Sequence, residues 1–334
     1  MNINTTMHSP TVEELNRQGV EHHLAGRLSE AAETYHQALA LDSDNATTHN
    51  NLGFLLAQTG QVNDALEHLE LAVELKPTLA NAHANLGQLL AMQGDAQAGT
   101  HHLVRATDLQ PGNPQNWYNL ARIRLLSNNA KGAVSALQEA VRLDSTNAVY
   151  LRELGKAQSL GGDYELALAT YAQALRLSPN DPETLIGRGV VLFMQQNYPE
   201  ALDTLKSALK FQPTHPVALR HLGLVLAGNG QNNEAIDTLE AMLELHPDES
   251  AIRLDLAVLL ISEQRQSEAL SHLKKIPLPL ANTGRVRFYL GVAMLKQDQN
   301  NAMSILTSLS DSTDVYAARA KEQISLLRRQ ENQL

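Results

Sequence analysis

The sequence predicts an all-α fold of the solenoid type, in which antiparallel helix pairs stack in a row. A small residue returns every 34 positions without a break in register, at Gly19, Gly53, Gly87, Ala121, Gly155, Gly189, Gly223, Ala257 and Gly291. A fixed period of this length over most of a chain indicates a stacked-repeat architecture. The chain of 334 residues is 43% hydrophobic but only 4% aromatic. This composition favours helices packed through alanine and leucine over sheets, which need β-branched and aromatic residues.

Each repeat is predicted to contain two antiparallel helices. The repeats begin at Val12, Ala46, Ala80, Pro114, Ala148, Pro182, Pro216, Ser250 and Gly284. The recurring small residue is the eighth of each repeat and lies in the first helix. Its counterpart in the second helix is the twentieth residue, found at Ala31, Ala65, Gly99, Ala133, Ala167, Ala201, Ala235 and Ala269. Two small residues that face each other let the helices cross closely, because larger side chains would overpack the crossing.

Glycines and prolines mark where the helices end. The turn between the two helices of a repeat carries Gly26, Gly60, Gly94, Gly162 and Gly230, or polar residues such as Asn128 and Gln196. Glycine and such polar residues are typical of the turns that follow helix ends. A proline at the thirty-second position ends the second helix, at Pro77, Pro111, Pro179, Pro213 and Pro247. Proline cannot continue the backbone hydrogen-bond ladder of a helix.

The pattern weakens from the seventh repeat onward. The twenty-seventh position is alanine in the first six repeats but becomes Met242 and then Ile276. The eighth repeat ends on Pro277 and Pro279 instead of one late proline. We therefore expect an irregular connection over residues 277–283 and altered packing of the last repeat and a half.

A final helix is predicted over Val315 to Gln330, with Ala320, Ile324 and Leu327 on one face. Solenoid ends need a cap with a polar outer face, and we expect this helix to supply it; an amphipathic membrane anchor is the alternative. The predicted divisions are a disordered tail at 1–11, eight repeats at 12–283, a degenerate ninth repeat at 284–312, and the capping helix and tail at 313–334.

The repeat resembles the tetratricopeptide repeat. The second repeat carries Leu52-Gly53 and Pro77 where that family has leucine, glycine and proline, and Trp117 of the fourth repeat stands at the family's tryptophan. The resemblance covers roughly residues 12–310. It implies a right-handed superhelix whose first helices line a concave groove, and a non-catalytic role in binding other proteins.

Charge and composition limit the partners. The formal net charge is -10, which argues against nucleic acid and anionic membranes, since both need a positive surface. No cysteine occurs, which excludes a disulfide scaffold and a thiol nucleophile. No signal peptide is visible over residues 1–10, and no apolar run is long enough to insert into a membrane. We expect a cytoplasmic protein.

We predict no enzyme, no cofactor and no metal site. The sequence has no phosphate-binding glycine loop, no zinc-protease motif and no nucleophile elbow. Among the 13 histidines, His49 and His83 take the fourth repeat position, which the family usually gives to a packing aromatic. His68 and His102 share the twenty-third position, but a metal site there lacks an identifiable third ligand.

The sixth repeat position gives the sharpest functional prediction. It is asparagine in three successive repeats, at Asn51, Asn85 and Asn119. This ladder resembles the one in the repeat domain of O-linked N-acetylglucosamine transferases, where the amides hold the backbone of an extended peptide. An asparagine amide offers a donor and an acceptor, as a peptide unit does. The alternative is that asparagine is simply common at this position.

Cations follow the asparagines along the predicted groove. Peptide-binding candidates at the fifth and ninth repeat positions are Tyr118, Arg122, Arg152, Lys156 and Arg220. They predict a site for an acidic segment or a carboxylate, which arginine can hold with two hydrogen bonds. The alternative is internal pairing with Glu153 and Glu183.

Some relatives clamp the carboxylate tails of heat-shock chaperones with a lysine and an asparagine of the first repeat. The matching positions here are Asn16 and Val20. This departure argues against that co-chaperone role.

The function predicted from the sequence is a non-catalytic adaptor or scaffold that binds an extended peptide or protein. The resemblance suggests bacterial secretion or envelope assembly as its context. One alternative is a self-assembling homo-oligomeric scaffold. Another is a regulatory subunit of a separate enzyme such as a glycosyltransferase, because about fifty residues outside the repeats are too few for a nucleotide-binding domain.

Overall fold

The computed structural model describes residues 10–331, and every regular element in this range is helical. The predicted all-α repeat fold is therefore confirmed. Residues 1–9 of the predicted disordered tail and residues 332–334 lie outside the described residues. The described helices form two compact units, which divide between Leu177 and Ser178.

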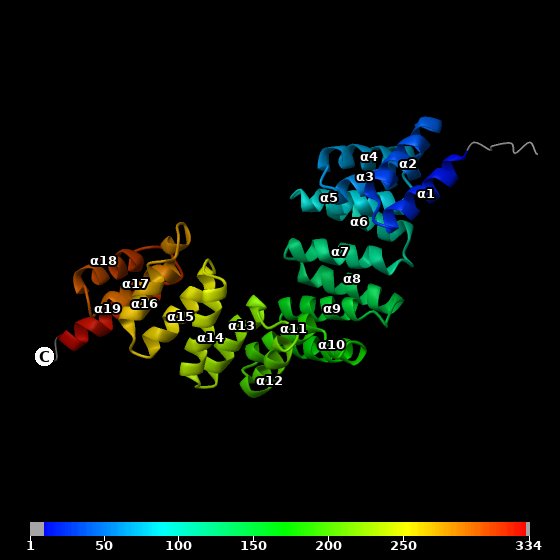
Figure 1. Cartoon of the computed structure of the whole chain (residues 1–334). Helices are drawn as coiled ribbons and strands as arrows, with labels where there is room; N and C mark the ends of the chain where they lie inside the picture. The colour runs from blue at the N-terminus through cyan, green and yellow to red at the C-terminus, as the bar shows by residue number, and fades with distance from the viewer. Residues whose placement is uncertain (1–9, 332–334) are drawn as a thin grey trace, which may run out of the picture. The chain divides into compact units, whose positions relative to one another are not determined.

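Unit 1 contains five helix pairs (Figure 1). They are α1 (Val12–Leu24), α2 (Leu28–Leu41), α3 (Ala46–Gln58), α4 (Val62–Leu75), α5 (Ala80–Met92), α6 (Ala96–Leu109), α7 (Pro114–Leu126), α8 (Ala130–Leu143), α9 (Ala148–Leu160) and α10 (Tyr164–Leu177). In each pair the first helix packs on the second, and within the unit α2, α4, α6 and α8 each pack on the first helix of the next pair. Successive first helices also contact each other directly, as α1 does α3, α3 does α5 and α5 does α7. One face of unit 1 is thus built from first helices.

Unit 2 continues the same pairing. Its helices are α11 (Pro182–Met194), α12 (Tyr198–Leu209), α13 (Pro216–Gly228), α14 (Asn232–Leu245), α15 (Ser250–Ser262), α16 (Gln266–Leu273), α17 (Gly284–Met294), α18 (Gln299–Ser310) and α19 (Ala317–Glu331), with a short 3₁₀ helix η1 (Leu280–Asn282) before α17. The last helix packs on α18, where Ala320 and Ile324 are buried against Leu306 and Leu309.

The eighth position of the repeat is small because the second helix comes very close to it. A Cβ placed on Gly53 would lie 2.8 Å from Leu69 Cγ and 3.1 Å from the backbone oxygen of Ala65. The sequence predicted the contact with the twentieth residue, Ala65. The structure adds that the twenty-fourth residue, here Leu69, occupies the space that a glycine leaves, and Tyr35 does the same over Gly19.

The turn inside each pair lies at the predicted residues, and the structure adds that their backbone is left-handed. The backbone angle φ is positive at Gly26, Gly60, Gly94, Gly162 and Gly230, and at Asn128 (55°), Gln196 (60°) and Gln264 (61°). Glycine adopts this conformation without steric cost, and asparagine tolerates it better than most residues. Every pair from α1/α2 to α15/α16 therefore turns through the same backbone geometry.

Candidate functional site

Three adjoining pockets lie on the first-helix face of unit 1. The pocket between α1 and α3 has a volume of about 550 Å³, the one between α3 and α5 about 180 Å³, and the one that reaches from α5 over α7 to α9 about 280 Å³. Neighbouring pockets share wall residues: Phe54 and Gln58 line the first two, and Gln88 and Met92 line the second and third. We call this row of pockets the groove of unit 1.

Each pocket of the groove contains one asparagine of the predicted ladder. Asn51 lines the first, Asn85 the second and Asn119 the third. The regular spacing follows from the repeat, because the sixth residue of each first helix projects between that helix and the preceding one. The structure thus brings the three predicted amides onto one continuous surface.

The first two ladder amides are held by hydrogen bonds between repeats. Asn51 Nδ2 donates to Asn16 Oδ1 at 3.4 Å, and Asn50 Nδ2 donates to Asn51 Oδ1 at 3.1 Å. Asn85 Nδ2 donates to Asn50 Oδ1 at 2.9 Å. This chain of four amides joins α1, α3 and α5. It fixes the orientation of Asn51 and Asn85, which are both half-buried.

The third ladder residue has a different environment. Asn119 is only 5% exposed, and its Oδ1 accepts a hydrogen bond from Gln115 Nε2 at 2.9 Å. Gln115 in turn accepts from the Tyr150 hydroxyl at 3.2 Å. Burial is also the main cause that raises the pKa of Tyr150, so this hydroxyl stays protonated and able to donate. The asparagine ladder therefore consists of two half-buried amides and one nearly buried amide.

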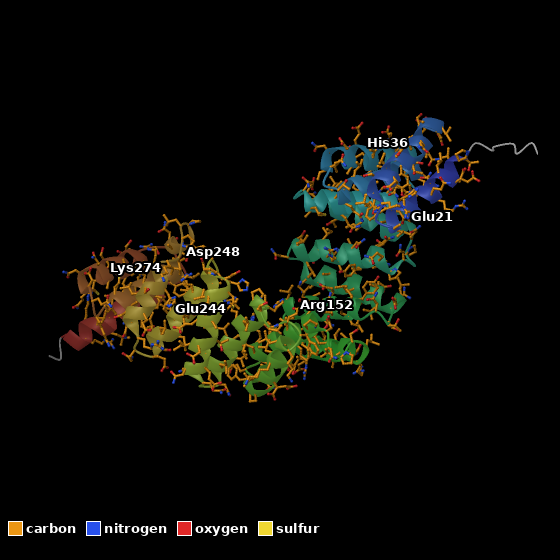
Figure 2. The ribbon with its side chains drawn as sticks, viewed as in Figure 1. Glu21, His36, Arg152, Glu244, Asp248 and Lys274 are labelled. Carbon is orange, nitrogen blue, oxygen red and sulfur yellow. The ribbon has the colours of Figure 1, made fainter. Side chains whose placement is uncertain are left out.

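The predicted cations of unit 1 differ in their pairing. Arg122 is exposed, its guanidinium lies 5.8 Å from the centre of the Tyr118 ring, and it forms no ion pair with any residue in the described range. Arg152, which lies on α9 (Figure 2), is 3.4 Å from the Glu153 carboxylate, and Lys156 is 3.9 Å from it. Internal pairing with Glu153, one of the alternatives from the sequence, thus occurs for Arg152 and Lys156.

The predicted cation of unit 2 is part of a buried ion pair. Arg220 Nη2 lies 2.6 Å and Nε 2.7 Å from Asp255 Oδ2. Arg285 Nη2 approaches the other oxygen of the same carboxylate at 3.1 Å. The side chain of Asp255 is only 4% exposed. This triad joins α13, α15 and α17, whereas Glu183 lies 3.3 Å from His215 and not beside a predicted cation of this unit.

Two histidine pairs of identical geometry lie in neighbouring repeats of unit 1. The Nδ1 atoms of His49 and His68 are 2.8 Å apart, and those of His83 and His102 are 3.0 Å apart. His49 Nε2 lies 2.9 Å from the Ser43 carbonyl, which can only accept a hydrogen bond. A neutral His49 therefore carries its proton on Nε2 and accepts from His68 at Nδ1.

Protonation of the histidine that accepts the hydrogen bond would disrupt either histidine pair. If His49 gained a proton, its Nδ1 would become a donor that faces the donor of His68. Burial lowers the pKa of His68, and a proton on His49 would lower it further, whereas Glu67 raises it. Burial likewise lowers the pKa of His83 and of His102. Burial thus disfavours the charged form of His68, His83 and His102.

The stability of unit 1 is expected to fall when the pH is lowered from about 7 to about 5. Histidine in the unfolded chain has a pKa of about 6.5, and the folded pKa values of His68, His83 and His102 lie lower. The unfolded chain therefore binds more protons in this range, so stability is full above about pH 6.5 and declines below it. The free energy of unfolding from urea titrations at several pH values measures the effect.

The double substitution His68→Gln and His102→Gln should flatten this pH dependence. A glutamine amide can donate to His49 or His83 but does not titrate. His22→Gln, which lies outside both pairs, serves as the control. An equally steep decline in the double variant would contradict the assignment of the effect to these pairs.

The structure gives no group of three or more histidine, cysteine, aspartate or glutamate side chains suited to a metal ion within residues 10–331. In the same range, no helix has the length and apolar content needed to cross a membrane.

Among the lining residues of the groove that sequence reasoning did not single out, four share two repeat positions. Phe54 and Gln88 take the ninth repeat position, and Gln58 and Met92 take the thirteenth. The sequence did indicate that the ninth position lines the groove, because Arg122 and Lys156, two predicted groove residues, take this position in the next two repeats. The histidine pairing was also missed, although both pairs have the same separation of 19 residues.

Family models match most of the chain. A model described as "TPR repeat" matches residues 19–60 and 55–94, and two models described as "Tetratricopeptide repeat" match residues 84–148 and 152–216 and residues 226–290. The chain belongs to the tetratricopeptide repeat family. Tetratricopeptide repeats generally mediate interactions between proteins and are typically non-catalytic. A search of the curated proteins found no match.

Solved structures show the same fold. A tetratricopeptide repeat protein from Parabacteroides merdae is 19% identical, with a TM-score of 0.59 over 74% of this chain and 98% of its own. Pseudomonas aeruginosa pilF is 16% identical, with a TM-score of 0.56 over 62% and 94%. YrrB, described as a TPR protein with an unusual peptide-binding site, is 23% identical, with a TM-score of 0.50 over 56% and 97%.

Proposed function

We propose that this tetratricopeptide repeat protein is a non-catalytic adaptor that binds an extended polypeptide segment in the groove of unit 1. The single observation that carries the proposal is the row of three adjoining pockets, each with one ladder asparagine in its wall. Amides at a regular spacing can bond the backbone of an extended chain with little regard to its sequence. The spacing of the asparagines in the sequence resembles the ladder of O-linked N-acetylglucosamine transferases, and YrrB is described as having a peptide-binding site.

The hydrogen bonds between the asparagines support this role. A binding amide that is already oriented loses less side-chain entropy when it meets its ligand. Asn51 and Asn85 are oriented by Asn16 and Asn50, and each amide nitrogen or oxygen has a second hydrogen-bonding position for a ligand. The same bonds contribute to the stacking of repeats, so the ladder has a structural role as well.

The groove also has a cation for an acidic group of the ligand. Arg122 lines the third pocket with its guanidinium exposed and outside any ion pair of the described residues. Lys156 lines the same pocket, but its ammonium group is paired with the Glu153 carboxylate, which also lines that pocket. We therefore assign Arg122 as the main contact for a carboxylate, with Lys156 as a weaker one. Arg220 is assigned to the ion pair with Asp255 instead.

The triple substitution Asn51→Ala, Asn85→Ala and Asn119→Ala tests the proposal. It should reduce the affinity for extended peptides, presented as an array of short sequences, by about tenfold or more, because each lost neutral hydrogen bond contributes about 0.5–1.5 kcal/mol. Peptide affinity is measured by fluorescence anisotropy, and helical circular dichroism reports whether the variant is folded.

A matched control changes three exposed amides on second helices. The substitutions are Asn63→Ala on α4, Gln97→Ala on α6 and Gln138→Ala on α8, in the same repeats as the ladder. This variant should bind like the unmodified protein. Unaltered binding by a folded ladder variant, or equal loss in both variants, would refute the groove as the binding site. Light scattering against concentration tests the alternative of a self-assembling scaffold.

A further inference from the structure

The pockets of the groove repeat at the spacing of the first helices. Directly packed helices have axes about 8–10 Å apart, and α1, α3, α5 and α7 contact one another in succession. The first pocket lies between α1 and α3, the second between α3 and α5, and the third begins between α5 and α7. A segment that crosses these helices therefore meets a new pocket about every 8–10 Å.

This spacing selects one backbone conformation of the ligand. In a β-strand, side chains on one face recur after two residues, or about 6.7 Å. In a polyproline II helix they recur after three residues, or about 9.3 Å, and the backbone has no internal hydrogen bonds. An α-helical ligand would come near the spacing after seven residues, at about 10.5 Å. Its backbone groups are bonded internally, however, so it would leave the ladder amides without partners.

The first two pockets suit apolar side chains. Val20, Leu24 and Phe54 line the first, and Phe54, Leu89 and Met92 line the second. Leu24 is 84% exposed and Met92 is 78% exposed. Exposed apolar side chains are common singly, but here they gather at pockets that already contain a polar group for the backbone. Such a combination of apolar walls and a few polar groups is typical of binding sites.

The third pocket has a different chemistry. Its apolar wall consists of Met92, Ile123, Leu125 and Leu126, and the charged side chains of Arg122, Lys156 and Glu153 line it as well. The exposed guanidinium of Arg122 is complementary to a carboxylate, which it can bind with two parallel hydrogen bonds. All three pockets thus have apolar side chains in their walls, and only the third also has arginine, lysine and glutamate side chains.

We propose that the groove of unit 1 recognises a polyproline II segment with apolar side chains three residues apart and an acidic residue three positions beyond them. This inference rests on the proposed function and specifies its ligand. The apolar side chains occupy the first and second pockets, and the carboxylate meets Arg122 in the third. The ladder amides bond the peptide backbone between these side chains.

Two capped synthetic peptides of identical composition test the spacing. One has the sequence Leu-Ala-Pro-Leu-Ala-Pro-Glu, and the other, Leu-Ala-Leu-Pro-Ala-Pro-Glu, places its leucines two residues apart. The reversed sequence of the first peptide is included, because the backbone can cross the groove in either direction. Affinity for the full chain is measured by fluorescence anisotropy. Of the first peptide and its reversed sequence, the tighter binder should bind about tenfold more tightly than the peptide whose leucines are two residues apart. Burial of one leucine side chain is enough for such a difference.

Substitutions in the protein test which groove residues cause the preference for leucines three residues apart. Met92→Glu should abolish the preference for the three-residue spacing, and the high exposure of Met92 makes this change compatible with folding. Met194→Glu, at the same repeat position in unit 2 and 51% exposed, is the matched control and should keep the preference. Arg122→Glu should remove the advantage of a peptide ending in glutamate over one ending in glutamine.

The outcomes separate the two proposals. Equal affinity for the two spacings, or a preference for the two-residue spacing, would overturn the polyproline II inference. Failure of all designed peptides, while array peptides still bind through the asparagine ladder, would overturn it too and leave the proposed function standing. Absence of any peptide binding would refute both.

Discussion

Replacing Gly87 by valine is expected to destabilise unit 1 by about 2–3 kcal/mol, the cost of overpacking a close contact. A Cβ on Gly87 would lie 2.8 Å from the backbone oxygen of Gly99 and 2.9 Å from Leu103 Cγ. A flexible side chain could move away from a new methyl group, but the backbone of α6 can do so only if the whole helix shifts. Because α6 also packs on α7, such a shift would disturb the next repeat.

Alanine at the same position should cost much less than valine. Alanine favours a helix over glycine by about 0.5–1 kcal/mol, which offsets part of the clash. The fourth repeat also shows that the geometry tolerates two methyl groups, because Ala121 and Ala133 take the equivalent positions and are both fully buried. Valine carries two methyl groups on its Cβ, so a crossing that accommodates alanine does not accommodate valine.

Urea unfolding followed by circular dichroism measures the difference between the variants. Gly112→Val is the matched control, since a Cβ at Gly112 meets no atom within 4 Å and its backbone lacks a positive φ. The control should unfold at the same urea concentration as the unmodified chain. If Gly87→Val behaved like this control, the close crossing of α5 and α6 would be wrong.

The regular features of this fold could be predicted from the sequence because they recur. One glycine says little, but a small residue at the eighth position of every repeat identifies the helix crossing, and the turn residues place the helix ends. The same regularity predicted that Asn51, Asn85 and Asn119 share a surface. Each of these inferences needs only the period and the handedness of a helix.

The individual side-chain contacts could not be predicted in the same way. Asn119 is nearly buried while Asn51 is half-buried, and Asn119 bonds Gln115, which in turn bonds Tyr150, instead of another asparagine. Whether a cation is available depends on which carboxylate reaches it, from its own helix as for Arg152 and Lys156 or from a neighbouring repeat as for Arg220. The pairing of Arg220 joins residues 35 positions apart, and the sequence pattern does not indicate which acid within reach is the partner.

Removing the carboxylate of Asp255 is expected to destabilise unit 2 by about 2 kcal/mol, within the range for breaking charged hydrogen bonds of a buried group. Asp255→Ala leaves a gap at a side chain that is 4% exposed and removes the partner of both Arg220 and Arg285. The side chains of these arginines are 32% and 42% exposed. Both can regain water, so the loss should stay below that of a fully buried pair.

The triad should also show coupling that an isolated surface pair lacks. Arg220→Ala and Arg285→Ala remove partners from opposite oxygens of one carboxylate, so a double-mutant cycle between them should give an interaction energy of about 0.5 kcal/mol or more. Glu139→Ala, which breaks the exposed pair with Arg142, is the control and should change the free energy of unfolding by less than about 0.5 kcal/mol. Strictly additive arginine effects would contradict the expected coupling, and equal losses for Asp255→Ala and Glu139→Ala would show that Asp255 does not stabilise the contacts of α13, α15 and α17. Arg220 would then be available as a ligand contact, because its pairing with the Asp255 carboxylate would contribute nothing to the free energy of unfolding.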